Sequence, residues 1–169
     1  MISDFLKALE LKTAEFKRLE ELNKTHDTAF KLKLDKCQKC AYCCKIRSCI
    51  PTPDELRKVA KFFKMSVKDL IKKYYCIDCM PNRSSVLFVK PAGLNQLDLV
   101  GKKIPDLRTY NEGNCVFLDE NNLCKIHSIG IEHAKGLVCY SSSKESTEKV
   151  LKTWEGGKLE EMYDVEEEK

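Results

Sequence analysis

Ten cysteines in a chain of 169 residues limit what this sequence can fold into. Four of them form the run Cys37-x2-Cys40-x2-Cys43-Cys44, which is too tight to pair off comfortably as disulfides. The residues after Met1 lack a basic segment followed by an apolar one, so we predict no secretory signal and a cytoplasmic location. In a reducing compartment, spaced cysteines are more often metal ligands than disulfides.

Thiolates are soft donors that suit both zinc and iron–sulfur clusters, and a C-x2-C pair lets a short loop present two sulfurs to one centre. A further pair, Cys76-x2-Cys79, follows the run, and Cys49 stands alone, where a small buried hydrophobe is an equal alternative. The predicted metal ligands are Cys37, Cys40, Cys43, Cys44, Cys76, Cys79, Cys115, Cys124 and Cys139.

Charge and hydropathy exclude other classes of protein. The formal net charge is +4, but bound thiolates add negative charge that this count omits. Aromatic residues make up only 8% of the chain, and we find no extended ladder of aromatic and basic residues, so a nucleic-acid partner is not expected. No uncharged apolar run approaches the roughly 18 residues that cross a bilayer, so no membrane span is expected either.

Helical signals recur along the chain. Residues 3–24 carry apolar side chains at helical spacing, which we expect to pack on the core; binding of a partner is the alternative. Thr52-Pro53-Asp54-Glu55 combines a cap, a first-turn proline and an acid three residues after the cap, and predicts the start of a second helix. Ser66 begins a third, which runs to Tyr74. The apolar positions of the first helix are Phe5, Leu9, Phe16, Leu19 and Leu22.

The predicted fold class is α+β: a small, loop-rich cysteine-cluster domain with several helices and a short β-hairpin, stapled by metal. Residues 84–90 are expected to form a strand, and residues 115–127 a hairpin that turns at Asn121-Asn122. The predicted organisation is an N-terminal helical extension (1–35), a metal-binding domain (36–140), and a C-terminal helix with an acidic tail (141–169), loosely ordered from residue 158.

Hairpin geometry favours two metal centres. With a two-residue turn, Cys115 and Cys124 lie four residues apart along the ladder, about 13 Å at ~3.3 Å per residue, which is too far to share a centre unless the hairpin is bulged or its turn longer. One centre would then use the run at Cys37, and the other Cys76 and Cys79.

The chain resembles the YkgJ-like cysteine-cluster family of zinc- or iron-chelating domains, whose hallmark is C-x2-C-x2-C-C. The resemblance covers residues 36–140 and includes Cys115-Val116-Phe117-Leu118 and Cys124-Lys125-Ile126, with His127 in the place of a family tyrosine. The family closes with Arg-Pro before a final cysteine, whereas this chain has Lys135-Gly136-Leu137-Val138-Cys139. The resemblance implies metal chelation.

We expect one or two iron–sulfur clusters, [4Fe-4S] in type, used in electron transfer or in a larger enzyme system. A zinc-structured protein-interaction module is the alternative, and participation of His127 or His133 would favour it. Metal delivery or storage is a third reading. No catalytic motif stands out, so enzyme status stays open. A protein or redox partner is expected.

Overall fold

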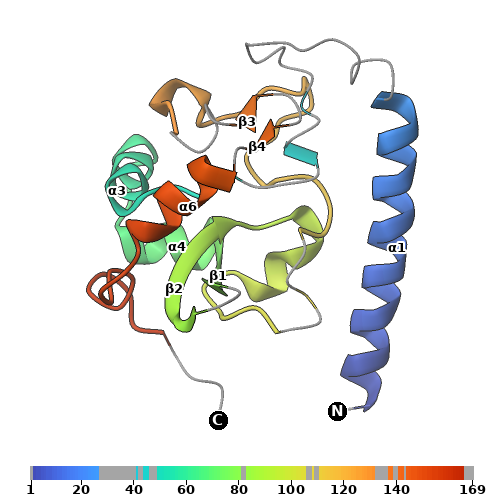
Figure 1. Ribbon diagram of the computed structural model, residues 1–169, viewed down its shortest axis with the longest axis horizontal. Helices are drawn as coiled ribbons and strands as arrows, with labels where there is room; N and C mark the ends of the chain where they lie inside the picture. Colours follow the sequence, from blue (N-terminus) through green and yellow to red (C-terminus); the bar gives the residue numbers. More distant parts are fainter. Residues whose placement is uncertain are drawn as a thin grey trace.

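The computed structural model describes residues 2–26, 41, 44–45, 49–80, 83–105, 108, 111–131, 137–138, 141–142 and 144–165. It confirms the predicted α+β class, with several helices and a two-stranded antiparallel sheet, β1 paired with β2 (Figure 1). Within the described ranges, no helix is both long enough and apolar enough to span a membrane.

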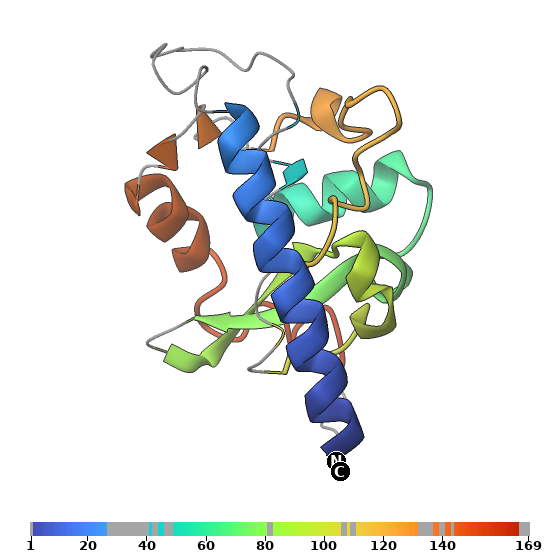
Figure 2. The same ribbon diagram turned by 90° about the vertical axis from the view of Figure 1, so that its right-hand side faces the viewer.

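The N-terminal helix α1 (Ile2–His26) extends along one side of the molecule and crosses in front of the remaining elements in Figure 2. The helix was predicted, but the expected core packing of its apolar side chains is wrong for Leu9 and Phe16, which are 47% and 54% exposed. Its buried side chain in the described part is instead that of Glu15. Polar contacts of Glu15, described below, attach this helix to the domain, and apolar packing does not.

Helices α3 (Pro53–Phe62) and α4 (Val67–Tyr74) begin where their capping residues predict. The Thr52 hydroxyl accepts a hydrogen bond from the Glu55 amide (3.2 Å), and the Glu55 carboxylate accepts one from the Thr52 amide (2.7 Å). The Ser66 hydroxyl accepts from the Asp69 amide at 3.0 Å. These caps satisfy amides that the first turn of a helix leaves unpaired.

Strand β1 (Tyr75–Met80) pairs antiparallel with β2 (Arg83–Pro91), which confirms the strand expected at residues 84–90. Because strand side chains alternate between faces, β1 divides two clusters of buried residues. Tyr75 and Ile77 belong to the main core, which also contains Leu56, Leu70, Phe117 and Trp154 among others. Cys76 faces a smaller cluster with Ala92, Leu99 and Ile104.

Shorter elements follow. In the described residues they are the 3₁₀ helices η2 (Leu94–Leu99) and η4 (His127–Ile129), the paired strands β3 (Leu137–Val138) and β4 (Ser141–Ser142), and helix α6 (Lys144–Lys152).

The C-terminal segment corrects a prediction. Residues 158–165 are not loosely ordered, because Leu159 is fully buried and Tyr163 is 5% exposed, both in the main core. The Tyr163 hydroxyl also donates a hydrogen bond to the Gly101 carbonyl at 2.9 Å. The two apolar side chains lie four residues apart and reach the core together, although acidic residues surround them in the sequence.

The hairpin predicted at residues 115–127 is a series of turns with one bridge, between Leu118 and Cys124. The Asp119 carboxylate accepts hydrogen bonds from the amides of Asn121 and Leu123, and Asn122 has the positive φ (60°) that asparagine tolerates. The loop is therefore longer than two residues. The segment from Cys115 to Leu118 is itself a turn, since the Leu118 amide donates to the Cys115 carbonyl at 2.9 Å.

Candidate metal centre

Four cysteines from separate parts of the chain pack against the main core. They are Cys44, Cys49, Cys115 and Cys124, of which Cys115 is buried and the others are half-buried. Two of these segments are joined directly, because the Cys115 amide donates a hydrogen bond to the Cys44 carbonyl at 2.9 Å. The fold thus brings the end of the C-x2-C-x2-C-C run beside a cysteine from the second half of the chain.

Backbone strain lies within that run. Ala41, between Cys40 and Cys43, has a φ of 61°, a left-handed conformation that costs a residue with a β-carbon roughly 1–2 kcal/mol. Its carbonyl accepts a hydrogen bond from the Lys45 amide at 3.0 Å. This bond ties Ala41 to the residue that follows Cys44.

Cys115 is held by close packing of its own segment on the turn at residues 93–96. The Leu94 amide donates to the Asn114 carbonyl (2.9 Å), and the Asn95 amide to the Glu112 carbonyl (3.1 Å). A β-carbon on Gly93 would stand 1.9 Å from that Glu112 carbonyl oxygen, so only glycine fits there. The backbone of residues 112–114 therefore packs directly against the turn at residues 93–96, next to Cys115.

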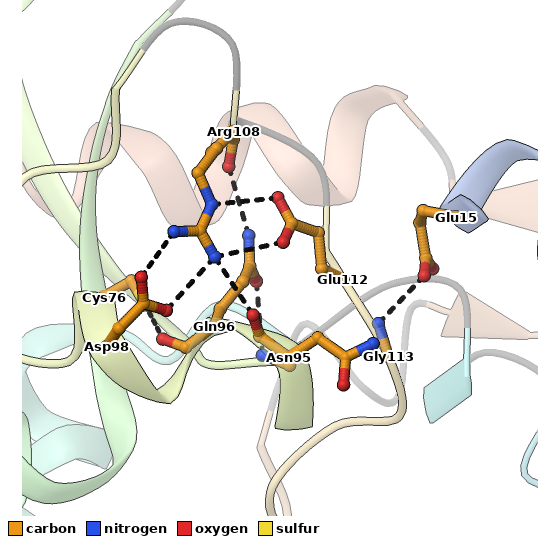
Figure 3. A network of polar contacts seen from close by, with 9 residues as sticks. Glu15, Cys76, Asn95, Gln96, Asp98, Arg108, Glu112 and Gly113 are labelled. Carbon is orange, nitrogen blue, oxygen red and sulfur yellow. Dashed lines mark hydrogen bonds and ion pairs between the residues drawn. The ribbon is translucent and has the colours of Figure 1, made fainter. Parts of the chain in front are cut away.

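An ionic network secures the same segment from its other side (Figure 3). The Arg108 guanidinium lies between Asp98 and the buried Glu112, which accepts from it at 3.1 and 3.2 Å. The Arg108 carbonyl accepts from the buried Gln96 side chain at 3.1 Å. The hydrogen bond from Arg108 lowers the pKa of Asp98. Because Arg108 and Glu112 are paired, the cost of burying their charges is reduced. The network also fixes the position of the segment that leads into Cys115.

Helix α1 contacts both cysteine segments through one pair of charged residues. The buried Glu15 carboxylate accepts hydrogen bonds from the Gly113 amide (3.0 Å) and from Arg18 (2.9 Å). Arg18 in turn donates to the Lys45 carbonyl and to the Asn114 side chain (3.3 Å). Lys45 follows Cys44 and Asn114 precedes Cys115, so the Glu15–Arg18 clasp ties both cysteines to the N-terminal helix.

Replacing Arg18 with methionine should therefore lower the free energy of unfolding by about 1–2 kcal/mol, because buried Glu15 loses its ionic partner and two acceptors lose a donor. Arg57→Met is the matched control: its ion pair with Asp54 has the same spacing but is exposed, and its loss should cost less than about 0.5 kcal/mol. Urea unfolding of both variants measures the difference. Equal losses would mean that the clasp does not hold α1.

Contacts with residues near the chain's end position Cys49. The Trp154 indole donates to the Pro51 carbonyl at 2.9 Å, and the capping box at Thr52 fixes the next residue. Cys124 is positioned by its bridge to Leu118 and by the His127 amide, which donates to its carbonyl at 3.0 Å. The backbone at each described cysteine of the site is thus positioned by contacts with other segments.

The Tyr75 hydroxyl is a buried polar group with no hydrogen-bond partner in the described part of the chain. Burial raises the pKa of this phenol well above its usual value, and the charges of Cys115, Cys49, Cys124 and Glu55 raise it further. Cys115 belongs to the same core cluster as Tyr75, and Cys49 and Cys124 pack against that cluster. An unpaired buried hydroxyl is rare in folded proteins, and this one lies in the core against which the cysteines pack.

The observed turns correct the expected separation of Cys115 and Cys124. The predicted distance between them assumed a regular ladder with a two-residue turn, whereas the loop is longer and Cys115 lies in a turn of its own. Cys115 belongs to the main core cluster, and Cys124 packs against it. The spacing of about 13 Å expected for a flat ladder therefore does not apply.

The Cys76-x2-Cys79 pair does not form the expected loop. Both residues are in strand β1, where side chains three residues apart point to opposite faces. Cys76 is fully buried in the smaller cluster, its sulfur 3.9 Å from the Gln96 carbonyl oxygen, and burial raises the pKa of its thiol to about 12. Cys79 is half-buried. Ligation by this pair stays a prediction, and strand geometry opposes a shared centre.

Replacing Cys76 with alanine distinguishes a metal ligand from a core residue at this position. If Cys76 is a core residue, we expect unchanged metal content and a loss of about 1 kcal/mol in stability. In metal-free protein the folded state keeps the Cys76 proton up to about pH 12, while the unfolded state releases it near pH 9.0. Stability should therefore fall between these values, by at most ~1.4 kcal/mol per pH unit, and less in Cys76→Ala.

Denaturation near neutral pH and at about pH 10.5, on both proteins, measures this difference. A fall in bound metal on replacement of Cys76 would instead make it a ligand. An equal pH dependence in the two proteins would show that the buried thiol titrates normally.

Other predicted ligands are outside the described residues: Cys37, Cys40, Cys43 and Cys139. The same holds for His133, while His127 is exposed and so is not part of the buried cluster. Among the residues that the structure describes, no three histidine, cysteine or carboxylate side chains are close enough to hold a metal ion unaided. The cysteines of the run that lie outside the described residues stay predicted ligands.

Sequence reasoning gave no role to Tyr75 and left Cys49 between a ligand and a core residue. The available signal for Tyr75 was its place directly after the α4 segment and before Cys76. Nothing local marks its hydroxyl as unpaired, because that depends on which residues surround it in the folded core.

An α+β domain in which cysteines from several segments pack against one core is a cysteine-cluster domain by its architecture. The CxxCxxCC family, described as a "putative zinc- or iron-chelating domain", matches residues 36–155, and this chain belongs to that family. The family function is chelation of zinc or iron. No curated protein and no solved structure matches the chain.

Proposed function

We propose that this protein carries an iron–sulfur cluster, [4Fe-4S] in type, on cysteine thiolates, and that it acts in electron transfer or as the cluster-bearing component of an enzyme system. The proposed ligands come from the run and from the cysteines that pack beside it. They are Cys37, Cys40, Cys43, Cys44, Cys49, Cys115 and Cys124, with Cys139 as a further candidate. Such a number leaves room for one or two clusters.

The observation that carries this proposal is the packing of Cys49, Cys115 and Cys124 in or against one core cluster, with His127 exposed. An all-sulfur donor set is the one that iron–sulfur clusters use. Cys44 adds a fourth thiol through its backbone contact with Cys115, and chain connectivity keeps Cys43 next to it. More thiols are thus available than a single tetrahedral zinc takes.

A bound cluster would supply a one-electron couple, and the chain would hold it and limit water around it. Tyr75 and Phe117, both nearly inaccessible to solvent, line the core beneath the thiols, with ring centroids 5.6 Å apart. An apolar wall on one side and solvent on the other is a common way to set the potential of a cluster. A cytoplasmic location and an unidentified redox partner are part of the proposal.

Zinc is the second candidate, as the centre of a protein-interaction module. The observation that favours it is the surface of α1, where Leu6 and Leu9 are 51% and 47% exposed. A closed thiolate site would then staple the segments around Cys44 and Cys115, and the helix would contact another protein.

Purification without oxygen, followed by iron, acid-labile sulfide and zinc analysis, separates the two candidates. Stoichiometric iron and sulfide with broad visible absorption supports the cluster. A colourless protein with bound zinc, which retains zinc when iron and sulfide are supplied, supports the module and contradicts the cluster.

A further inference from the structure

Helices α3 and α4 expose a basic surface that contains none of the cysteines. Residues 57–73 carry seven basic side chains against one acidic side chain, that of Asp69, and all seven basic side chains are exposed. Together with the exposed ring of Phe62 they form what we call the α3–α4 surface. Its basic members are Arg57, Lys58, Lys61, Lys64, Lys68, Lys72 and Lys73.

The apolar side of each helix determines which side chains face solvent. The buried residues of the two helices lie on their core sides, and the lysines lie on the remaining faces. Residues three or four apart on a helix are surface neighbours, so Lys58 lies beside Lys61 and Phe62, and Lys68 lies beside Lys72. The apolar residues that fix this orientation are Leu56, Val59, Ala60, Leu70 and Ile71.

Much of this positive charge has no counter-ion in the part of the chain that the structure describes. Arg57 pairs with Asp54 at 2.7 Å, and the Lys73 ammonium lies 5.2 Å from the Tyr74 ring centroid. Four other side chains make no ion pair or hydrogen bond with a described residue. They are Lys58, Lys61, Lys64 and Lys72. A solvated surface usually mixes both signs of charge, whereas like charges on neighbouring positions repel each other.

Two observations indicate that the complementary surface is an acidic protein. The Asp164 carboxylate, from the C-terminal segment, already binds the Lys68 ammonium at 3.2 Å, so a protein carboxylate fits on this surface. Phe62 is 50% exposed beside Lys58, and exposed aromatic rings are enriched where proteins bind each other.

The aromatic residues also argue against a nucleic acid at this surface. Binding of single strands uses several exposed rings on which successive bases stack. Here Phe63 and Tyr74 are only partly exposed, because both pack on the buried Phe117 ring, with centroids 5.8 and 5.2 Å from it. Phe62 is thus the one exposed ring of these two helices.

We propose that the α3–α4 surface binds an acidic surface of another protein, with Phe62 as its apolar anchor. Charge complementarity of this kind accelerates association and sets the orientation of the partner. The inference goes beyond the proposed function, because it names the chemistry of a partner and does not depend on the metal that the cysteines bind.

Two fluorescent peptides test the inference on the full chain by anisotropy: an oligoglutamate, and the same peptide with a central tryptophan. Lys58→Gln/Lys61→Gln should weaken binding of both about fivefold or more, and added salt should weaken binding to the wild type. Phe62→Ala should remove the preference for the tryptophan peptide and leave the affinity for oligoglutamate unchanged.

Lys149→Gln/Lys152→Gln is the matched control. These lysines of α6 are also exposed and three residues apart, and their replacement changes the net charge equally. In Figure 2, α6 (red-orange) lies on the opposite side of the molecule from α3 (blue-green). The control should keep the wild-type affinity for both peptides. Because all four lysines are exposed, the melting temperatures should match that of the wild type.

Three results would overturn the inference. They are a wild type that binds neither peptide, an equal loss of affinity in the two lysine variants, and tighter binding of a single-stranded oligonucleotide of the same charge than of the tryptophan peptide. The last result would assign the surface to nucleic acid. Iron, sulfide and zinc analysis of the same preparations tests the proposed function separately, because none of these substitutions removes a proposed ligand.

Discussion

Cys124→Ser should lower metal affinity at least 100-fold, or roughly 3 kcal/mol, and remove most of the stabilisation that bound metal gives. Cys124 is half-buried, lies at the bridge with Leu118, and acts on the same phenol as Cys115 and Cys49. Serine keeps the size of the side chain but replaces a soft thiolate with a poor ligand. Metal content and the metal-dependent shift in melting temperature measure the effect.

Cys79→Ser is the matched control, because Cys79 is equally half-buried but lies in strand β1. Because the proposed ligand set omits Cys79, this variant should keep its metal. Cys40→Ala, in the C-x2-C-x2-C-C run, should behave like Cys124→Ser and lose metal and stability together. If Cys79→Ser lost the metal and Cys124→Ser kept it, the centre would be at the β1 pair instead.

Gly93→Ala is expected to lower the free energy of unfolding by about 3 kcal/mol or more. The new β-carbon would meet the Glu112 carbonyl oxygen at 1.9 Å and its carbon at 2.7 Å, and backbone atoms cannot yield as a flexible side chain does. Relief requires that the segment leading to Cys115 move away from the turn at residues 93–96. Chemical denaturation measures the loss.

Gly156→Ala provides the comparison, since its β-carbon would find nothing within 4 Å. Its positive φ of 78° still costs an alanine roughly 1–2 kcal/mol. The Gly93 variant should therefore be the less stable of the two. A loss at Gly93 no greater than that at Gly156 would mean that the two backbones separate freely.

Local signals predicted the elements that depend on neighbours in sequence. Thr52 and Glu55 form the capping box expected of their spacing, and Ser66 caps α4 as predicted. The strand at residues 84–90 is also confirmed. Capping depends on atoms three residues apart and strand formation on short-range propensity, so the necessary information lies within a few residues.

Pairing and burial were less predictable. The apolar spacing of α1 indicates a helix but not what covers it, and the chain buries Glu15 there because Gly113 offers an amide to the carboxylate. Leu159 and Tyr163 are surrounded by acidic residues in the sequence, yet both side chains are buried in the main core. Neither outcome follows from periodicity, because each depends on a surface formed elsewhere.

Cysteine spacing and helix caps are local properties, so the family, the abundance of thiols and the main helices could be predicted from the sequence. Which thiols pack against the same core depends on contacts between distant segments. Alternation along β1 places Tyr75 in the main core, which also contains Cys115, and places Cys76 in a separate apolar cluster. Residues adjacent in sequence thus received different environments, because a strand directs successive side chains to opposite faces.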